Sequence, residues 1–270
     1  MKKIISILLS AACALAFAAC AGQSPTESPS ESPDGDLAYI TDRDKLVIGV
    51  TQYEPMNYKD ADGNWTGFDT EFAEAVCGKL GVTPVFQEIN WETKETELKG
   101  KTIDCIWNGL TVDDDRRENM DFSLSYLRNE QVVVVPAAFL SDNSAPGKDS
   151  FDGLTVVAED GSAGETAAAE LPGTVIVPVE TQAAALLEVK AGTASAAVID
   201  ATMASAMTGE GTEYADLAVL DLSLTAEEYA IGFRLGSDVT AAVDGIIRDL
   251  IADGTLAAIA EKYGLSGRLV

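Results

Sequence analysis

The stretch DCIWNGLTVDDDRR, residues 104–117, joins an apolar run to a polar segment that ends in two adjacent arginines. The run DCIW is typical of a strand buried within a sheet. Arg116 and Arg117 have two readings. Each can pair with neighbouring acids at the surface, or one can project into a cleft and hold a carboxylate through two parallel hydrogen bonds. Spacing alone does not choose between them.

Outward from this stretch, apolar runs alternate with helical patterns. Asp69 is an expected helix cap, Gly81 stops the same helix, and Thr111 is the expected cap of the helix that the aspartates begin. The alternation predicts a parallel sheet with helices on both faces. The expected strands are 46–50, 82–87 and 103–107, and the expected helices are 69–80, 91–98 and 113–120.

A second α/β series follows the apolar run 132–135. Its expected strands are 154–158, 175–179, 196–199 and 217–222, and its expected helices begin at 161 and span 181–190. The chain then returns through a strand at 229–233 and two helices, 238–252 and 255–263. Two similar α/β units predict two lobes with a cleft between them. Sites in open α/β sheets lie beyond the carboxyl ends of the strands.

The N-terminus is expected to direct export. Residues 1–20 combine two lysines, an apolar run and small residues before Cys20, as in a secretory signal. The run Phe17-Ala-Ala-Cys20 resembles a bacterial lipobox, which would make Cys20 the acylated first residue of the mature protein; ordinary signal cleavage is the alternative. Residues 21–36, rich in Ser, Pro and Glu, predict a disordered tether. Cys77 and Cys105 are the two cysteines of the globular body, and the sequence leaves open whether they form a disulfide or stay as two buried thiols.

Composition excludes several classes of function. The 270 residues carry a formal net charge of −26, which repels phosphate backbones and argues against nucleic-acid binding. The absence of histidine removes the usual near-neutral acid or base and the commonest metal ligand. Residues 60–71 have the oxygen spacing of a calcium loop, but Trp65 stands where the loop requires glycine. Ser162 lacks a nucleophile elbow, and a turn that opens a helix is its simpler role. No metal or cofactor is expected.

The body of the chain resembles the family 3 extracellular solute-binding proteins, the polar amino-acid receptors of ABC importers. Its landmarks here are IGVTQYEPMNY (48–58), GFDTEFAEAV (67–76), residues 90–123, FDGLTVVAEDGS (151–162) and DGTLAAIAEKYG (253–264). The resemblance implies a two-lobe fold of the type II periplasmic-binding class, with the ligand enclosed between the lobes. It divides the chain into lobe 1, residues 37–130 and 230–270, and lobe 2, residues 131–229.

The resemblance also implies a set of ligand-binding residues. Arg116 becomes the clamp for the α-carboxylate, which leaves Arg117 at the surface, and Asp200 receives the α-ammonium group. The other implied contacts are Thr111 and Ser162 at the carboxylate, Asn108 and Gly109 at the rim, and Tyr53 and Trp91 around the ligand side chain.

The expected function is binding of a polar amino acid for delivery to an ABC permease, by hinged closure of two lobes and without catalysis. The protein is expected to be a monomer, held by its lipid to the outer face of the membrane. Ala163, Glu54 and Trp107 depart from the family pattern and leave the ligand open among basic, neutral polar and sulfur-containing amino acids. Two alternatives are a dehydratase-like enzyme on the same fold and a sensor domain, which would need a transmembrane helix and cytoplasmic module after residue 270.

Overall fold

The computed structural model describes residues 35–142 and 145–270. The expected signal, the lipidation at Cys20 and tether residues 21–34 lie outside the described residues. The last two tether residues belong instead to helix α1 (Gly35–Asp42), where Asp36 is ion-paired with Arg234 at 2.8 Å and Lys101 at 3.6 Å. No helix within the described ranges is long and apolar enough to cross a membrane.

The first sheet has the strand order β4-β1-β5-β13-β6, and β7 pairs with the other end of β13. Strand β1 runs parallel to β4 and β5, whereas β13 is antiparallel to β5, β6 and β7. The strands are β1 (Lys45–Val50), β4 (Thr83–Glu88), β5 (Cys105–Thr111), β6 (Met120–Phe122), β7 (Leu127–Asn129) and β13 (Glu227–Arg234). The hairpin of β2 (Tyr58–Lys59) and β3 (Trp65–Thr66) lies beside it.

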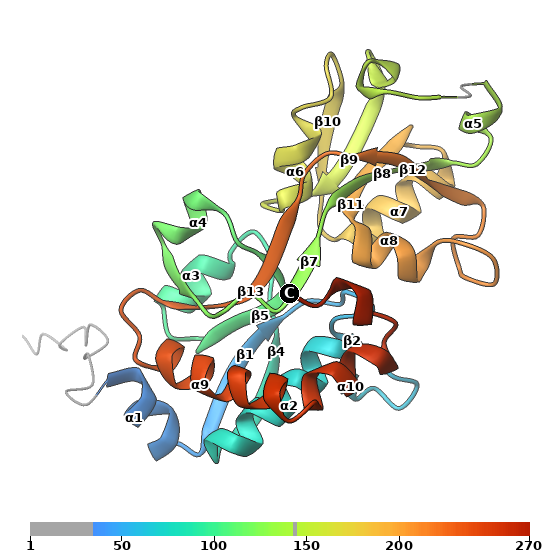
Figure 1. Cartoon of the computed structure of the whole chain (residues 1–270). Helices are drawn as coiled ribbons and strands as arrows, with labels where there is room; N and C mark the ends of the chain where they lie inside the picture. Colours follow the sequence, from blue (N-terminus) through green and yellow to red (C-terminus); the bar gives the residue numbers. More distant parts are fainter. Residues whose placement is uncertain (1–34, 143–144) are drawn as a thin grey trace, which may run out of the picture. The chain divides into compact units, whose positions relative to one another are not determined.

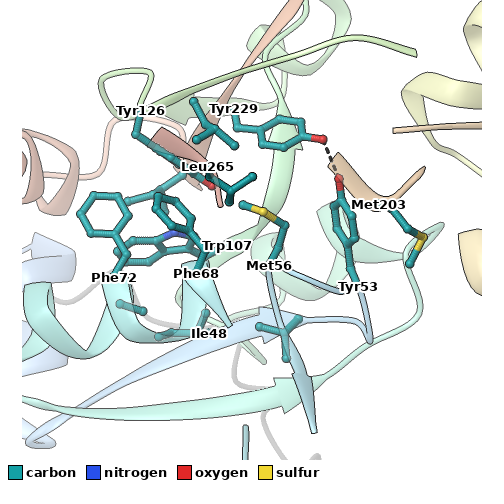
Figure 2. Packing of buried hydrophobic residues seen from close by; sticks show 14 of the residues in the cluster. Ile48, Tyr53, Met56, Phe68, Phe72, Trp107, Tyr126, Met203, Tyr229 and Leu265 are labelled. Carbon is teal, nitrogen blue, oxygen red and sulfur yellow. Dashed lines mark hydrogen bonds between the residues drawn. The ribbon is translucent and has the colours of Figure 1, made fainter. Parts of the chain in front are cut away.

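All seven residues of β5 are buried because helices cover both faces of this sheet. Cys105 and Trp107 pack with α2 (Phe68–Leu80), α9 (Val239–Ala252) and α10 (Thr255–Lys262), and Ile106 packs with α3 (Lys94–Lys99). Figure 2 shows the aromatic centre of the first face, where the Phe72 ring meets that of Trp107 edge-on at 5.0 Å. Edge-to-face contact is a favourable arrangement of two aromatic rings. A short 3-10 helix, η2 (Ser266–Arg268), follows α10.

The second sheet has the order β10-β9-β11-β8-β12. Alternate residues of β8 face opposite sides: Val132 and Val134 pack with α7, and Val133 and Val135 pack with α6. Its strands are β8 (Gln131–Pro136), β9 (Thr155–Glu159), β10 (Val175–Val179), β11 (Ala196–Asp200) and β12 (Leu217–Ser223). Its helices are α5 (Phe139–Asp142), α6 (Ala163–Ala168), α7 (Gln182–Ala191) and α8 (Ala201–Met207), with the turn η1 (Lys148–Phe151).

Two segments join the sheets (Figure 1). The chain leaves the first sheet at β7 and enters the second at β8, and it returns from β12 to β13. Strands β7 and β13 pair antiparallel, with Asn129 opposite Glu227. We refer to the part built on the first sheet as lobe 1 and to the part built on the second as lobe 2. The two-lobe α/β fold predicted from the sequence is confirmed.

Several local expectations were wrong. Asp69 does not cap helix α2, which begins at Phe68 after Gly67, because the buried Asp69 carboxylate accepts from the Gly109 N–H at 2.7 Å. The expected helix 113–120 is only α4 (Asp114–Arg117), since residues 120–122 form β6 against β13.

The cap of α4 is Asp113 rather than Thr111, which lies within β5. The Asp113 carboxylate accepts from the Arg116 N–H at 2.7 Å. The expected helix 91–98 begins at Lys94, because residues 90–93 form a turn in which Asn90 accepts from the backbone of Glu92. Cys77 and Cys105 are two buried free thiols, which answers the question that the sequence left open.

Gly67 is the glycine that this fold requires most. Its φ of 124° is unfavourable for other residues, and a Cβ there would collide with the backbone of Met56. Gly67→Ala is therefore expected to lower the free energy of unfolding by about 2 kcal/mol or more. Gly78→Ala is the matched control, because a Cβ at Gly78 in α2 meets open space and should stabilise by roughly 0.5–1 kcal/mol. Equal effects in urea denaturation would contradict this account.

Candidate ligand-binding site

One cavity between the lobes brings together all eight residues predicted as ligand contacts. Lobe 1 and lobe 2 both contribute to its lining, which also includes three residues that were not predicted as contacts, namely Glu159, Ala163 and Gln182. The lining consists of Tyr53, Trp91, Asn108, Gly109, Thr111 and Arg116 from lobe 1, and Glu159, Ser162, Ala163, Gln182 and Asp200 from lobe 2.

The topology explains why these residues meet. Thr111 and Glu159 are the last residues of β5 and β9, and Asp200 ends β11. Tyr53 and Ser162 follow shortly after β1 and β9. The carboxyl ends of neighbouring parallel strands meet at the same edge of a sheet, where ligands of α/β proteins bind. Each lobe therefore presents its strand ends to the other across the cavity.

Tyr53 connects the lobes at one end of the cavity. Its hydroxyl is hydrogen-bonded to the Tyr229 hydroxyl at 2.7 Å, as Figure 2 shows, and also to Thr202 at the start of α8. Burial, with Asp200 nearby, raises the pKa of Tyr53 well above its ordinary value, so the phenol is neutral. Gly109 allows this packing, because its φ is 58° and a Cβ there would lie 2.6 Å from the Tyr53 ring.

Asn108 and Gly109 form a rim whose polar groups already have protein partners. The Asn108 side chain accepts from the Thr51 N–H at 3.0 Å and from Asn57 at 2.8 Å. The Gly109 N–H donates to Asp69 at 2.7 Å. Burial raises the pKa of Asp69 to about 7. These two residues thus shape the cavity, and Asp69 is a positioning residue that sequence analysis took for a helix cap.

The two adjacent arginines lie in different environments, one buried and the other exposed. Arg116 is 7% exposed and lines the cavity. Its guanidinium donates to the Thr111 carbonyl at 2.8 Å and to the Gly161 carbonyl at 3.3 Å, and its Nε lies 3.2 Å from Asp113. Arg117 is exposed and lies over the Phe122 ring.

Lys94 is a second buried cation beside Arg116, and the sequence analysis missed it. Its Nζ donates to the Gly161 carbonyl of lobe 2 at 3.0 Å and to the Trp91 carbonyl at 3.1 Å. The ammonium group also lies 4.8 Å from the centre of the Trp91 ring. Burial, and then the nearby Arg116, lower the pKa of Lys94 to about 8. Two cations of lobe 1 therefore meet one carbonyl of lobe 2.

Ser162 begins helix α6 at that same turn. Its hydroxyl accepts from the Glu165 N–H at 3.0 Å, and the Glu165 carboxylate accepts from the Gly161 N–H at 2.9 Å. The two bonds tie Gly161 and Ser162 to the first turn of α6. The turn therefore holds the Gly161 carbonyl in a fixed place between Arg116 and Lys94.

Asp200 is held by a network of amide side chains. Asn129 and Gln131 donate to one carboxylate oxygen at 2.6 and 2.7 Å, and Gln182 donates to the other at 2.5 Å. Burial raises the pKa of Asp200 above its ordinary value, and the nearby Tyr229 hydroxyl and the three amides oppose this rise.

Glu227 shares part of this network. Asn129 and Gln131 each donate to Glu227 at 2.6 Å as well as to Asp200. Burial, and then Asp200, raise the pKa of Glu227 to about 7. Glu227 lies at the start of the strand that links the lobes, so the sequence analysis had no reason to place it beside the site.

The cavity lining combines the Arg116 guanidinium of lobe 1 with the Glu159 and Asp200 carboxyl groups of lobe 2. Buried charges are tolerated when each one has a partner of opposite charge or a set of hydrogen bonds. Such an arrangement suits a ligand that carries an anion and a cation a short distance apart.

The two lobes and the charged cavity between them define a solute-binding protein of the two-lobe type. Residues 46–266 match the bacterial extracellular solute-binding proteins, family 3, and the chain belongs to this family. The resemblance identified in the sequence is confirmed.

Relatives match over nearly their whole length. The arginine-binding extracellular protein ArtP of Bacillus subtilis (strain 168) is 26% identical over 267 residues, which are 97% of this chain and 98% of that protein. The ABC transporter glutamine-binding protein GlnH of the same organism is 26% identical over 97% of each chain. The crystal structure of the ancestral amino acid-binding protein AncCDT-1, a precursor of cyclohexadienyl dehydratase, is 28% identical with a TM-score of 0.76, covering 84% of this chain and 99% of that chain.

Asp69 makes the stability of the protein depend on pH. Because its pKa is raised to about 7, the folded protein keeps a proton that the unfolded chain releases near pH 4. The contribution of Asp69 is therefore fully present below pH 4 and is lost as the pH rises through 7. Asp69→Asn, which keeps an acceptor for Gly109, is expected to flatten the stability profile in this range.

The measurement is chemical denaturation of both proteins at pH 4, 5, 6 and 7. Asp62→Asn, a change at an exposed turn, is the control and should leave the slope unchanged. Parallel profiles for the wild type and Asp69→Asn would contradict the assignment.

Proposed function

We propose that this protein binds an amino acid outside the cytoplasm and delivers it to an ABC importer, with closure of the two lobes around the ligand. The family and the named ligands of its relatives support this proposal. The observation that carries it is the position of Arg116, a buried guanidinium at the meeting point of both lobes.

The hydrogen bonds of Arg116 leave room for a carboxylate. A guanidinium has five N–H donors. Within the described residues, Nε, Nη1 and Nη2 each have one protein partner, namely Asp113, Thr111 and Gly161. One N–H on each of the two terminal nitrogens is left, and this pair matches the two oxygens of a carboxylate. The Thr111 hydroxyl and Ser162 lie beside it in the cavity.

The opposite side of the cavity suits the α-ammonium group. In our proposal Asp200 receives it, with Tyr53 and Trp91 packed around the remainder of the ligand. Because Asp200 already accepts from three side chains, an ammonium group would share its oxygens with these donors. A ligand that touches Arg116 and Asp200 at once contacts both lobes, and its binding energy therefore favours the closed arrangement.

We propose binding rather than catalysis, although buried acids with raised pKa also occur in enzymes. The groups around the cavity are engaged in fixing one another: Lys94 donates to two carbonyl oxygens, and Ser162 caps α6. The relatives named as receptors for arginine and glutamine point the same way.

Arg116→Ala is expected to abolish amino-acid binding, roughly a hundredfold or greater loss, because it removes the charge that the carboxylate needs. Arg117→Ala is the matched control and should retain binding, since Arg117 is exposed outside the cavity. Calorimetry against the twenty amino acids measures both, and the bound ligand should be recovered chemically unchanged. Loss of binding in Arg117→Ala alone, or turnover of the ligand, would contradict the proposal.

We also propose that the mature protein is a monomer tethered by a lipid on Cys20. The run that precedes Cys20, and the extracellular location of the family, support this. Cys20→Ser is expected to move the protein from the membrane fraction to the soluble one, because a lipid chain contributes about 0.8 kcal/mol per buried methylene. Cys13→Ser lies within the signal and should leave it membrane-bound. A membrane-bound Cys20→Ser variant would refute the anchor.

A further inference from the structure

Glu159 is a buried acid that the ligand scheme above does not use. It ends strand β9 in lobe 2, lines the cavity and is only 4% exposed. Burial, and then the neighbouring Asp200, raise the pKa of Glu159 to about 8. Burying an ionised carboxylate is costly unless a cation or several donors compensate it.

Glu159 has far fewer hydrogen-bond partners than its neighbour Asp200. Three side chains donate to Asp200, from strands β7 and β8 and from helix α7. Gln182 is the one side chain of the described residues that is hydrogen-bonded to Glu159. A carboxylate offers about four acceptor positions. Glu159 is thus the cavity acid with acceptor capacity to spare.

Lys94 and Arg116 act on Glu159 from a distance, and both lower its pKa without forming an ion pair with it. Within residues 35–142 and 145–270, none lies within the 4.0 Å that defines an ion pair with Glu159. Lys94 directs its ammonium group to the Trp91 and Gly161 carbonyls, and Arg116 directs its guanidinium to Thr111, Gly161 and Asp113.

Glu159 is the acid of the cavity lining that has no charge partner in this scheme, since Asp200 faces the α-ammonium group. Because the pKa of Glu159 is raised to about 8, an amino acid with an uncharged side chain would leave its carboxyl group largely protonated at pH 7. A ligand with a further positive charge beside Glu159 would favour the ionised carboxylate and pair with it.

A larger pocket adjoins the cavity and is lined by more acidic than basic residues. Residues that line it include Lys94 and Arg116 as its basic members, against a larger acidic set: Glu92, Glu95, Asp113, Asp114, Asp115, Glu165, Glu170 and Glu227. A cleft lined with one sign of charge concentrates ligands of the opposite sign. A cationic ligand would therefore be attracted at the entrance as well as within the cavity.

We propose that the ligand is an amino acid with a cationic side chain, and that Glu159 is the residue that receives this cation. The inference rests on the proposed function and adds a specificity-determining residue to it. Asp200 remains the partner of the α-ammonium group, and Glu159 distinguishes a cationic side chain from an uncharged one of the same shape.

A matched pair of ligands tests the class of ligand. Arginine and citrulline have nearly the same shape, and only arginine carries the side-chain charge. Calorimetry on the wild type at pH 7 is expected to show arginine binding roughly tenfold or more tightly than citrulline. Citrulline binding equally well or better, or a clearly tighter uncharged amino acid, would overturn this inference while the proposed function stands. Failure of every amino acid to bind would overturn the proposed function itself.

Variants test the residue. Glu159→Gln keeps the shape and the hydrogen-bonding capacity but removes the charge, and it should reduce the arginine-to-citrulline preference roughly tenfold. Glu180→Gln removes one charge from the exposed surface of the same lobe and should leave the preference unchanged. An equal loss for both ligands in Glu159→Gln, or an unchanged preference, would overturn the assignment. Circular dichroism of the variant and its citrulline affinity report whether the fold is intact.

Discussion

The cost of burying charge governs this structure more than any other constraint. Four ionisable side chains, Lys94, Arg116, Glu159 and Asp200, are buried in or beside one cavity, and a buried charge is tolerable only with partners that compensate it. Asp200 depends on amides from α7, β7 and β8. Lys94 and Arg116 depend on carbonyl oxygens at Thr111, Trp91 and Gly161. Because these partners come from both lobes, moving the lobes apart would remove hydrogen bonds from the buried charged groups.

The link between the lobes is itself part of this network. Asn129 lies in β7 opposite Glu227 in β13, and these are the strands through which the chain crosses between the sheets. The Asn129 amide donates to Glu227 and to Asp200 of lobe 2. A rotation of the lobes about this link must change the surroundings of Asp200, and a cation bound to Asp200 must in turn favour one arrangement of the link. The Asn129 side chain thus connects Asp200 directly to the two strands that link the lobes.

The sequence contained enough information for the sheets and for most of the cavity, because strand ends are marked by apolar runs followed by polar residues. Asp200 stands directly after such a run, whereas Thr111 was expected as a helix cap beyond a strand at 103–107 and instead ends β5. Lys94 and Glu227 carry no such mark, since both occur among other charged residues and become buried or half-buried only through contacts with distant parts of the chain. Asp69 shows the same limit in another form: local rules favour it as a helix cap, and a contact with Gly109, forty residues away in the chain, takes its carboxylate elsewhere.

The Gly161 carbonyl shows how a ligand could strengthen the contact between the lobes. Lys94 approaches it at 3.0 Å and Arg116 at 3.3 Å, so two cations of lobe 1 share one neutral acceptor of lobe 2. A carbonyl is a weaker partner for a cation than a carboxylate, since a carbonyl oxygen carries no net charge to attract the cation. A carboxylate placed beside Arg116 would give that guanidinium the stronger partner while Lys94 kept the carbonyl. The lobes would then be held by both interactions at once, and closure would be most favourable only when the anion is present.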